Sequence, residues 1–186
     1  MRKNFGAKAM CYPMPVLIIG TYNADGTPNA MNAAWGGISE ETEITICVDS
    51  GHKTAENLLI RKAFTVSMAT APYMAACDYV GIVSGNKEPE KFTKAGFHAV
   101  KSGFVDAPLI QELPLALECE GLSYDTETCR LVGRIVNVCA EASILDETGK
   151  VDVRKLQPLT FDPMHHRYLM LGEDAGQAFH DGLQLK

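Results

Sequence analysis

Long hydrophobic runs are missing from this sequence, and no stretch reaches the roughly 18 apolar residues that a membrane-spanning helix needs. The first apolar segment, residues 16–20, is short and runs into a turn, so it predicts a strand rather than a signal peptide. Lysine and arginine are scattered, and the formal net charge is -6. Nucleic-acid binding requires a basic patch, so this distribution argues against it. We therefore expect a cytoplasmic protein with neither a membrane nor a nucleic-acid partner.

Several metal and nucleotide signatures are missing as well. The six cysteines include no CxxC pair, which argues against a zinc or iron–sulfur site of the usual spacing. His165 and His166 are adjacent, and neighbouring side chains of an extended segment point to opposite faces, so we expect no metal site there. Neither GxGxxG nor GxxxxGK[ST] occurs, which removes support for a Rossmann or P-loop nucleotide site.

The cysteines allow two interpretations. Cys47 and Cys139 fall in apolar, strand-like runs, where a reduced cysteine behaves as a small hydrophobic residue. Buried, reduced thiols are therefore expected, and a redox pair between distant cysteines is the alternative.

What the sequence does contain is typical of one globular domain, residues 1–186, with 46% hydrophobic and 22% charged residues. Asp25-Gly26 predicts a hairpin turn, and a long hairpin is expected around residues 125–128. In the helix at 55–62 we expect Leu58 and Leu59 to point inward. Strands are expected at 15–22, 27–37, 43–49, 64–69, 115–124, 130–142, 159–161 and 168–171, with short helices at 55–62, 73–83, 88–95 and 153–156. This succession predicts a mainly β protein, a barrel with short accessory helices.

The stretch DSGHKTAENL, residues 49–58, carries more hydrogen-bond donors than helix capping requires. Ser50, His52, Lys53 and Thr54 precede or open a short helix, whose first N–H groups are unpaired and carry the positive end of its dipole. These groups predict a phosphate cradle. The alternative is ordinary, with Thr54 capping the helix and Lys53 solvated.

The return arm of the first hairpin, TPNAMNAAWGG at residues 27–37, is rich in small residues. Small side chains allow either a ligand or another backbone to approach closely. Both interpretations, a ligand wall and tight strand packing, remain open at this point.

Taken in order, PVLIIGTYNADGTPNAMNAAWGG, DSGHKTAENL, FTVSMA, CDYVGIVSG, EKFTKAGF and DAPLIQELPLALECE resemble the flavin reductase-like, FMN-binding split-barrel family, in particular its flavoredoxin type. The resemblance covers about residues 13–140 and returns at YLMLGEDAGQAF. It implies a Greek-key split β-barrel with short accessory helices, and a homodimer with FMN near the subunit interface.

The resemblance also implies residue roles. Lys53 and Thr54 are expected to hold the FMN phosphate, with Ser50 and His52 close by. Lys91 is expected to reach the flavin, where its charge would stabilise the reduced, anionic ring. The remaining expected cofactor-binding residues border the ring or the ribityl chain: Asn32, Ala33, Ala34, Trp35, Val48, Asp49 and Phe161. Some relatives carry a histidine in the turn of the long hairpin, and here only Arg130 offers a stand-in.

For function, the resemblance implies an FMN-binding redox protein, with FMN supplying the chemistry and the protein supplying position and electrostatics. Two variants remain open: an NAD(P)H-dependent flavin reductase, which is an oxidoreductase enzyme, and a flavoredoxin-like carrier that exchanges electrons with an electron-transfer protein. The alternative from another class is a non-catalytic split-barrel module that binds flavin or haem. No catalytic side chain is assigned.

Overall fold

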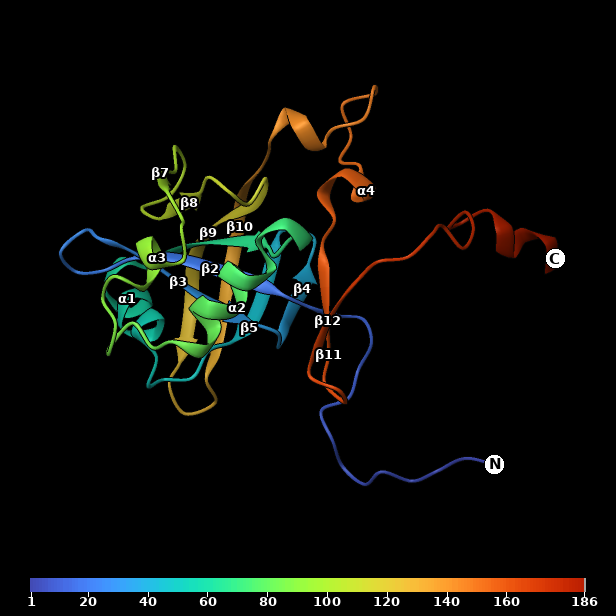
Figure 1. The fold of residues 1–186 in the computed structure, drawn as a ribbon, viewed down its shortest axis with the longest axis horizontal. Coiled ribbons are helices and arrows are strands. Elements are labelled where there is room, and N and C mark those ends of the chain that lie inside the picture. The colour runs from blue at the N-terminus through green and yellow to red at the C-terminus, as the bar shows by residue number, and fades with distance from the viewer. Residues whose placement is uncertain (186) are drawn as a thin grey trace.

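The computed structural model describes residues 1–185 and is mainly β, as predicted (Figure 1). The strands are β1 (Met14–Pro15), β2 (Leu17–Tyr22), β3 (Pro28–Ala33), β4 (Gly36–Glu40), β5 (Glu43–Cys47), β6 (Ala63–Met68), β7 (Ala99–Lys101), β8 (Pro108–Ile110), β9 (Leu115–Asp125), β10 (Arg130–Ala140), β11 (Leu159–Asp162) and β12 (Arg167–Met170). The α-helices are α1 (Lys53–Arg61), α2 (Met74–Ile82), α3 (Lys91–Lys94) and α4 (Val153–Leu156), and 3-10 turns are η1 (Ala71–Tyr73), η2 (Ala142–Ile144) and η3 (Asp181–Leu185).

The main sheet has seven antiparallel strands in the order β3-β2-β6-β9-β10-β5-β4. Its two edge strands, β3 and β4, are consecutive in the chain and are separated only by Ala34 and Trp35. A two-residue connection spans only a short distance, so the sheet curls until its edges lie close together without pairing. Residues 34–35 therefore mark the split of a split barrel.

Strand β2 is buried on both faces, which explains its nearly continuous apolar sequence. Leu17 and Ile19 lie in one hydrophobic core, together with Phe64. Ile18 lies in a second core, together with Val80 of α2. Two covered faces leave no solvent-facing row, so a strict alternation of polar and apolar residues is not needed.

The long hairpin β9–β10 closes the barrel and is shaped by close packing. Built onto Gly133 of β10, a Cβ atom would lie 2.3 Å from Cζ of Phe64, so only glycine leaves room for that buried ring. A register shift between Val132 and Gly133 marks the same place. Such an irregularity bends the strand and increases its twist, which suits the curvature of the sheet.

Helix boundaries differ from the predicted ones in two places. Helix α1 begins at Lys53, two residues earlier than expected, so Lys53 and Thr54 lie inside its first turn. Leu58 of α1 is buried as predicted. Leu59 was also predicted to point inward, and this is wrong, because Leu59 is 55% exposed. The third helix is shorter than expected and spans only Lys91–Lys94.

A second sheet, β1-β11-β12, stands beside the barrel on the side toward which both chain ends run (Figure 1). Tyr12 anchors the N-terminal segment to this second sheet, because its hydroxyl donates to Oδ1 of the buried Asp162, in β11, at 2.6 Å. In the part of the chain that the structure describes, no helix is both long and apolar enough to cross a membrane.

Candidate functional site

Three adjoining pockets form a groove along β3, and Asn32 borders all of them. The donor pocket, about 160 Å³, lies between the start of α1, the end of α2 and Lys91. The split pocket, about 310 Å³, is lined mainly by Met31–Trp35, Cys47, Asp49, His52 and Cys129. The aromatic pocket, about 210 Å³, is bordered by Ala34, Phe161 and Tyr168. A polar chamber thus opens toward two less polar ones.

The start of α1 presents unsatisfied donors to the donor pocket. Its N-cap residue is His52, whose side chain makes no capping hydrogen bond. Among residues 1–185, no group accepts from the backbone N–H of Lys53 or Thr54. These N–H groups carry the positive end of the helix dipole, which favours an anion.

Thr54 is buried and does not cap the helix, so the ordinary alternative interpretation of this residue is wrong. Its Oγ1 accepts from Nδ2 of Asn29 at 3.0 Å. A hydroxyl can donate while it accepts, so Thr54 keeps its own proton for a ligand in the pocket.

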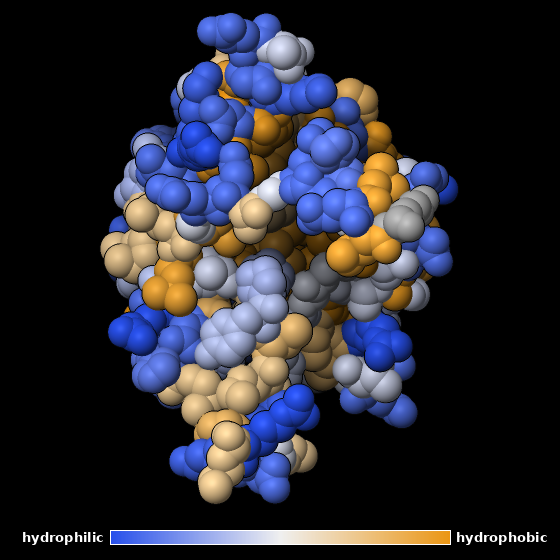
Figure 2. Space-filling model, turned by 90° about the vertical axis from the view of Figure 1, so that its right-hand side faces the viewer, coloured by the Kyte–Doolittle hydropathy of each residue, from blue (hydrophilic) through white to orange (hydrophobic). Residues whose placement is uncertain are grey.

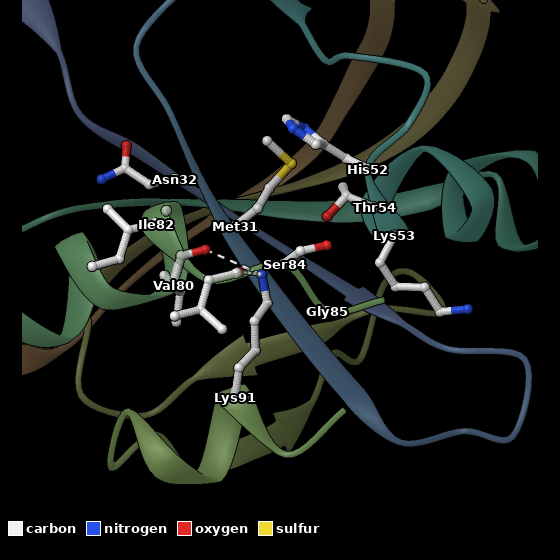
Figure 3. A pocket seen from close by; sticks show the side chains of 12 residues that line it. Met31, Asn32, His52, Lys53, Thr54, Val80, Ile82, Ser84, Gly85 and Lys91 are labelled. Carbon is white, nitrogen blue, oxygen red and sulfur yellow. Dashed lines mark hydrogen bonds between the residues drawn. The ribbon is translucent and has the colours of Figure 1, made fainter. Parts of the chain in front are cut away.

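Lys53 borders the pocket with its carbon chain but directs its ammonium elsewhere. Its Nζ forms an ion pair with Oε2 of Glu56 at 2.7 Å, and its side chain is 29% exposed. Figure 3 shows this Nζ pointing away from the centre of the pocket. The charge is therefore partly neutralised within the helix before any ligand arrives.

Lys91 is the buried cation of the site. Its Nζ donates to the carbonyl oxygens of Val80 at 3.1 Å and Val83 at 3.0 Å, at the C-terminal end of α2 (Figure 3). Burial lowers the pKa of Lys91 from 10.5 to about 8. An ammonium has three donors, and these two carbonyls use two of them. The third remains for a bound group.

The loop after α2 completes the donor pocket, and sequence reasoning missed it. Ser84 and Gly85 border the pocket together with Val80. A Cβ on Gly85 would lie 2.7 Å from Oδ1 of Asn29 and 3.1 Å from Cβ of Lys53, so glycine lets the loop close on α1. In the sequence this pair indicates only a break, because the residues that it packs against, Asn29 and Lys53, lie far earlier in the chain.

The aromatic pocket joins the outlying sheet to the barrel. The hydroxyl of Tyr168 donates to Oδ1 of Asp78 at 2.7 Å, and burial together with this carboxylate raises the pKa of Tyr168. The ring of Phe161 packs against that of Tyr168, with 6.0 Å between the ring centroids. Asn32, whose Nδ2 donates to the carbonyl oxygen of Cys77 at 3.1 Å, holds β3 against α2 here.

The split pocket lies where the barrel edges meet. Ala33 is buried and Ala34 half-buried, while Trp35 is 59% exposed. The carbonyl of Trp35 accepts from the backbone N–H of Cys47 at 2.7 Å, which ties the connection to β5. Small side chains at 33 and 34 leave the floor of the pocket open, and this supports the ligand-wall interpretation of the return arm.

Ten of the twelve residues predicted to bind the cofactor border this groove: Asn32, Ala33, Ala34, Trp35, Asp49, His52, Lys53, Thr54, Lys91 and Phe161. The other two do not. Val48 is fully buried in the barrel, and its carbonyl accepts from the hydroxyl of Tyr124 at 2.8 Å. Ser50 is exposed outside the three pockets. Near the long hairpin, Cys129 rather than Arg130 borders the groove.

Comparison with known proteins gives the chain its family. Residues 9–168 match the flavin reductase like domain. The fold superposes on flavoredoxin of Desulfovibrio vulgaris (Miyazaki F) with a TM-score of 0.93 and 35% identity, over 98% of this chain and 100% of that one. Flavoredoxin from Methanosarcina acetivorans gives a TM-score of 0.88 and 27% identity over 100% of both chains. An uncharacterised protein of Bacillus subtilis (strain 168), YdfE, is 24% identical over 95% of this chain and 93% of its own length. The chain therefore belongs to the flavin reductase-like split-barrel family and is a flavin-binding redox protein.

Proposed function

We propose that the protein binds FMN in the groove along β3 and passes electrons through it as a flavoredoxin-like carrier. The observation that carries this proposal is the pairing of a small, donor-rich pocket with a larger, less polar one on either side of Asn32. FMN has the same division, with a doubly charged phosphate at one end and a flat ring system at the other. The 35% identity to a flavoredoxin across nearly the whole chain supports the carrier function.

In this proposal the donor pocket holds the phosphate. The unpaired N–H groups of Lys53 and Thr54, the hydroxyl of Thr54 and the remaining donor of Lys91 converge on one chamber. Within residues 1–185, the donor pocket has hydrogen-bond donors that no protein group accepts from, and the oxygens of a phosphate can accept from all of them. A charged acceptor makes such bonds shorter and stronger than neutral ones, so the phosphate is held while the buried ammonium is neutralised.

The split pocket and the aromatic pocket take the ring. Ala33 and Ala34 admit a flat group, while Trp35 and Phe161 border it. When bound, the flavin supplies the electron and hydride chemistry. The protein positions the ring and excludes water from its apolar faces, while Lys91 lies with the phosphate in the donor pocket rather than beside the ring.

The decisive experiment is a spectrum of the purified protein followed by anaerobic reduction. We expect a bound-flavin spectrum and release of FMN, rather than FAD or haem, on denaturation. A haem Soret band would instead identify the non-catalytic haem module. Failure to bind FMN after unfolding, refolding and incubation with excess cofactor contradicts the proposal.

The electron donor is tested in the same cuvette. If the protein is a carrier, NADH and NADPH bleach the flavin slowly, while a reduced electron-transfer protein such as a ferredoxin bleaches it rapidly. Rapid bleaching by either pyridine nucleotide favours the second candidate, an NAD(P)H-dependent flavin reductase, which the family match supports.

We also propose a homodimer that meets near the groove. Several large apolar side chains around the split and the outlying sheet are exposed: Trp35, Ile38, Ile82, Met170 and Leu171. Figure 2 shows hydrophobic side chains in a hollow between polar lobes on the side that bears the chain ends. Light scattering tests this directly. A dimer mass that falls to the monomer mass in Met170→Glu supports this interface, and a wild-type monomer contradicts it.

A further inference from the structure

Two cysteines border the split pocket, and their thiols differ in setting from the four others. Cys47 is exposed and Cys129 is half-buried, and both line the pocket beside Ala33, Ala34 and Trp35. The expectation that Cys47 is buried in an apolar strand is therefore wrong. Its neighbours Ile46 and Val48 face the barrel core, and alternation along the strand turns Cys47 outward.

The other four cysteines have no such pocket. Cys77 and Cys119 are buried, and burial raises the pKa of each thiol to about 12, which keeps them protonated and unreactive. Cys11 lies exposed near the N-terminus, and the thiol of Cys139 donates to the carbonyl of Ala116 at 3.7 Å on β9. Thiol chemistry in the groove is therefore confined to Cys47 and Cys129.

Cys47 ends β5, and Cys129 directly precedes β10, the strand that pairs with β5, one residue out of register. Cys47 pairs with Arg130 in the β5–β10 ladder, and the N–H of Val48 donates to the carbonyl of Cys129 at 2.8 Å. One residue of offset between neighbouring strands corresponds to a Cα–Cα distance of about 5.8 Å. Disulfides span Cα–Cα distances of about 4.4–6.8 Å.

The backbone of Cys129 also turns its side chain out of the regular alternation. Its φ is +58°, a left-handed conformation at the end of the hairpin turn. Both cysteines also lie near the hydroxyl of Tyr124, whose pKa is raised first by burial and further by nearby groups that include Cys129 and Cys47. The thiol of Cys129 makes one weak contact, at 4.0 Å to the carbonyl of Thr126, which a rotation about χ1 releases.

Metal binding does not account for the pair. The split pocket also contains Asp49 and His52, yet over residues 1–185 no three His, Cys, Asp or Glu side chains come close enough together to hold a metal ion. Two thiols without a third ligand leave redox chemistry as the function that this arrangement supports.

We propose that Cys47 and Cys129 form a reversible disulfide that is reduced by flavin in the split pocket and in turn reduces an external, solvent-accessible disulfide. This inference rests on the proposed function, because reduced flavin is the electron source. It gives the protein a second class of electron acceptor besides electron-transfer proteins.

The chemistry balances in two steps. In the first, the exposed Cys47 thiolate attacks the external disulfide and releases one thiol, and Cys129 then attacks the mixed disulfide, releases the second thiol and closes the Cys47–Cys129 bond. In the second, this S–S bond breaks as it takes two electrons from the reduced flavin and two protons from the flavin and solvent. The flavin returns to its oxidised form, and both thiols are restored.

The first test needs no flavin. Apo protein is incubated with oxidised glutathione, and peptides are analysed by mass spectrometry without reduction. We expect a Cys47–Cys129 cross-linked peptide that is lost in Cys129→Ser, where Cys47 instead retains glutathione. The Cys11→Ser variant is the matched control and should cross-link as the wild type does. Stable glutathione adducts on both cysteines of the wild type, with no cross-link, contradict the proposal.

The second test counts electrons in the flavin-loaded protein. After oxidation by glutathione, the wild type should consume four electrons per flavin in an anaerobic titration, two for the disulfide and two for the flavin. Cys47→Ser, which lacks the attacking thiol, should consume two. Two electrons in both proteins contradict the disulfide proposal and leave the flavin function intact. A protein that cross-links but binds no flavin contradicts the proposed function instead.

Discussion

Two lysines border the donor pocket from opposite sides, and their surroundings give them different roles. Lys53, on α1, is partly exposed and already paired with a carboxylate. Lys91, on α3, is buried and donates only to backbone carbonyls. A neutral carbonyl orients an ammonium without cancelling its charge, whereas a carboxylate cancels it. Lys91 therefore presents a full, fixed positive charge to the pocket, whereas the charge of Lys53 is partly neutralised by Glu56.

The largest expected effect is that of Lys91→Met, which keeps the length of the side chain and removes the charge. Loss of a charge-assisted hydrogen bond costs about 1.5–3 kcal/mol, so FMN affinity should fall roughly tenfold to a hundredfold. Fluorescence titration measures it, with the exposed Lys94→Met as the control. Riboflavin, which lacks the phosphate, should lose less affinity than FMN. An equal loss for both would place Lys91 against the ring instead.

Raising the pH from 7 to 9 should weaken FMN binding up to about tenfold, because a group with a pKa one unit below the pH is mostly deprotonated. The pKa of Lys91 is about 8 in the unliganded protein, and an anion binds its protonated form. Affinity is therefore close to its maximum at pH 7 and falls as the pH rises through about 8. In Lys91→Met the pH dependence should disappear, and its persistence there would assign the titration to another group.

The free energy of unfolding of the apo protein should change with pH in the opposite direction. Between about pH 8 and the pKa of an unfolded lysine, about 10.4, the unfolded chain binds more protons at this position than the folded one. The Lys91 contribution to stability thus rises as pH increases through this window. Urea unfolding of the wild type and Lys91→Met, compared at pH 7.5 and 9.5, separates this contribution from that of other groups.

Thr54→Val should weaken FMN binding by a smaller factor, about two- to tenfold, because a neutral hydrogen bond contributes about 0.5–1.5 kcal/mol. Asn29 loses one acceptor but keeps Oγ1 of Thr21 at 3.3 Å, so we expect a loss of stability of about 1 kcal/mol. The matched control is Thr93→Val, whose hydroxyl lies on the exposed side of α3. Calorimetric binding and urea unfolding measure the two effects.

Lys53→Ala should have the smallest effect, at most about fivefold on FMN affinity, because exposed ion pairs and partly screened charges contribute about 0.2–1 kcal/mol. Lys87→Ala, at an exposed position outside the pocket, serves as the control. A loss equal to that of Lys91→Met would show that Lys53 leaves Glu56 when the ligand binds. The comparison between the two lysines would then be wrong.

Most strands were predictable because each is a local pattern, but the short strands β7 and β8 were missed, and the strand expected at 27–37 is two strands, β3 and β4. The alternation in residues 43–49 and the Asp25-Gly26 turn depend on neighbours in sequence, and the structure has both features. The start of α1 was placed two residues late, because the surplus donors of Lys53 and Thr54 resemble a capping segment, while the cap is the backbone of His52. Leu59 was misplaced because α1 covers the barrel with only one narrow face.

The sequence predicted which residues form the site better than it predicted how they are arranged. Family resemblance named both lysines, but nothing local in EKFTKAG shows that Lys91 is buried under the end of α2. Ser84 and Gly85 become part of the pocket only because Gly85 packs on Asn29 and Lys53. Such packing depends on the three-dimensional course of the chain between residues 29 and 85, which no short motif records.

The two-residue connection between β3 and β4 limits how this protein can change. Surface loops usually tolerate insertions, but residues 34–35 join the two margins of the curled sheet and also form one side of the split pocket. Any added residue there pushes the margins apart. The ligand preference of the split pocket can therefore change by substitution at residues 34–35 but not by insertion there. The turn at residues 126–128 is exposed and can accommodate insertions.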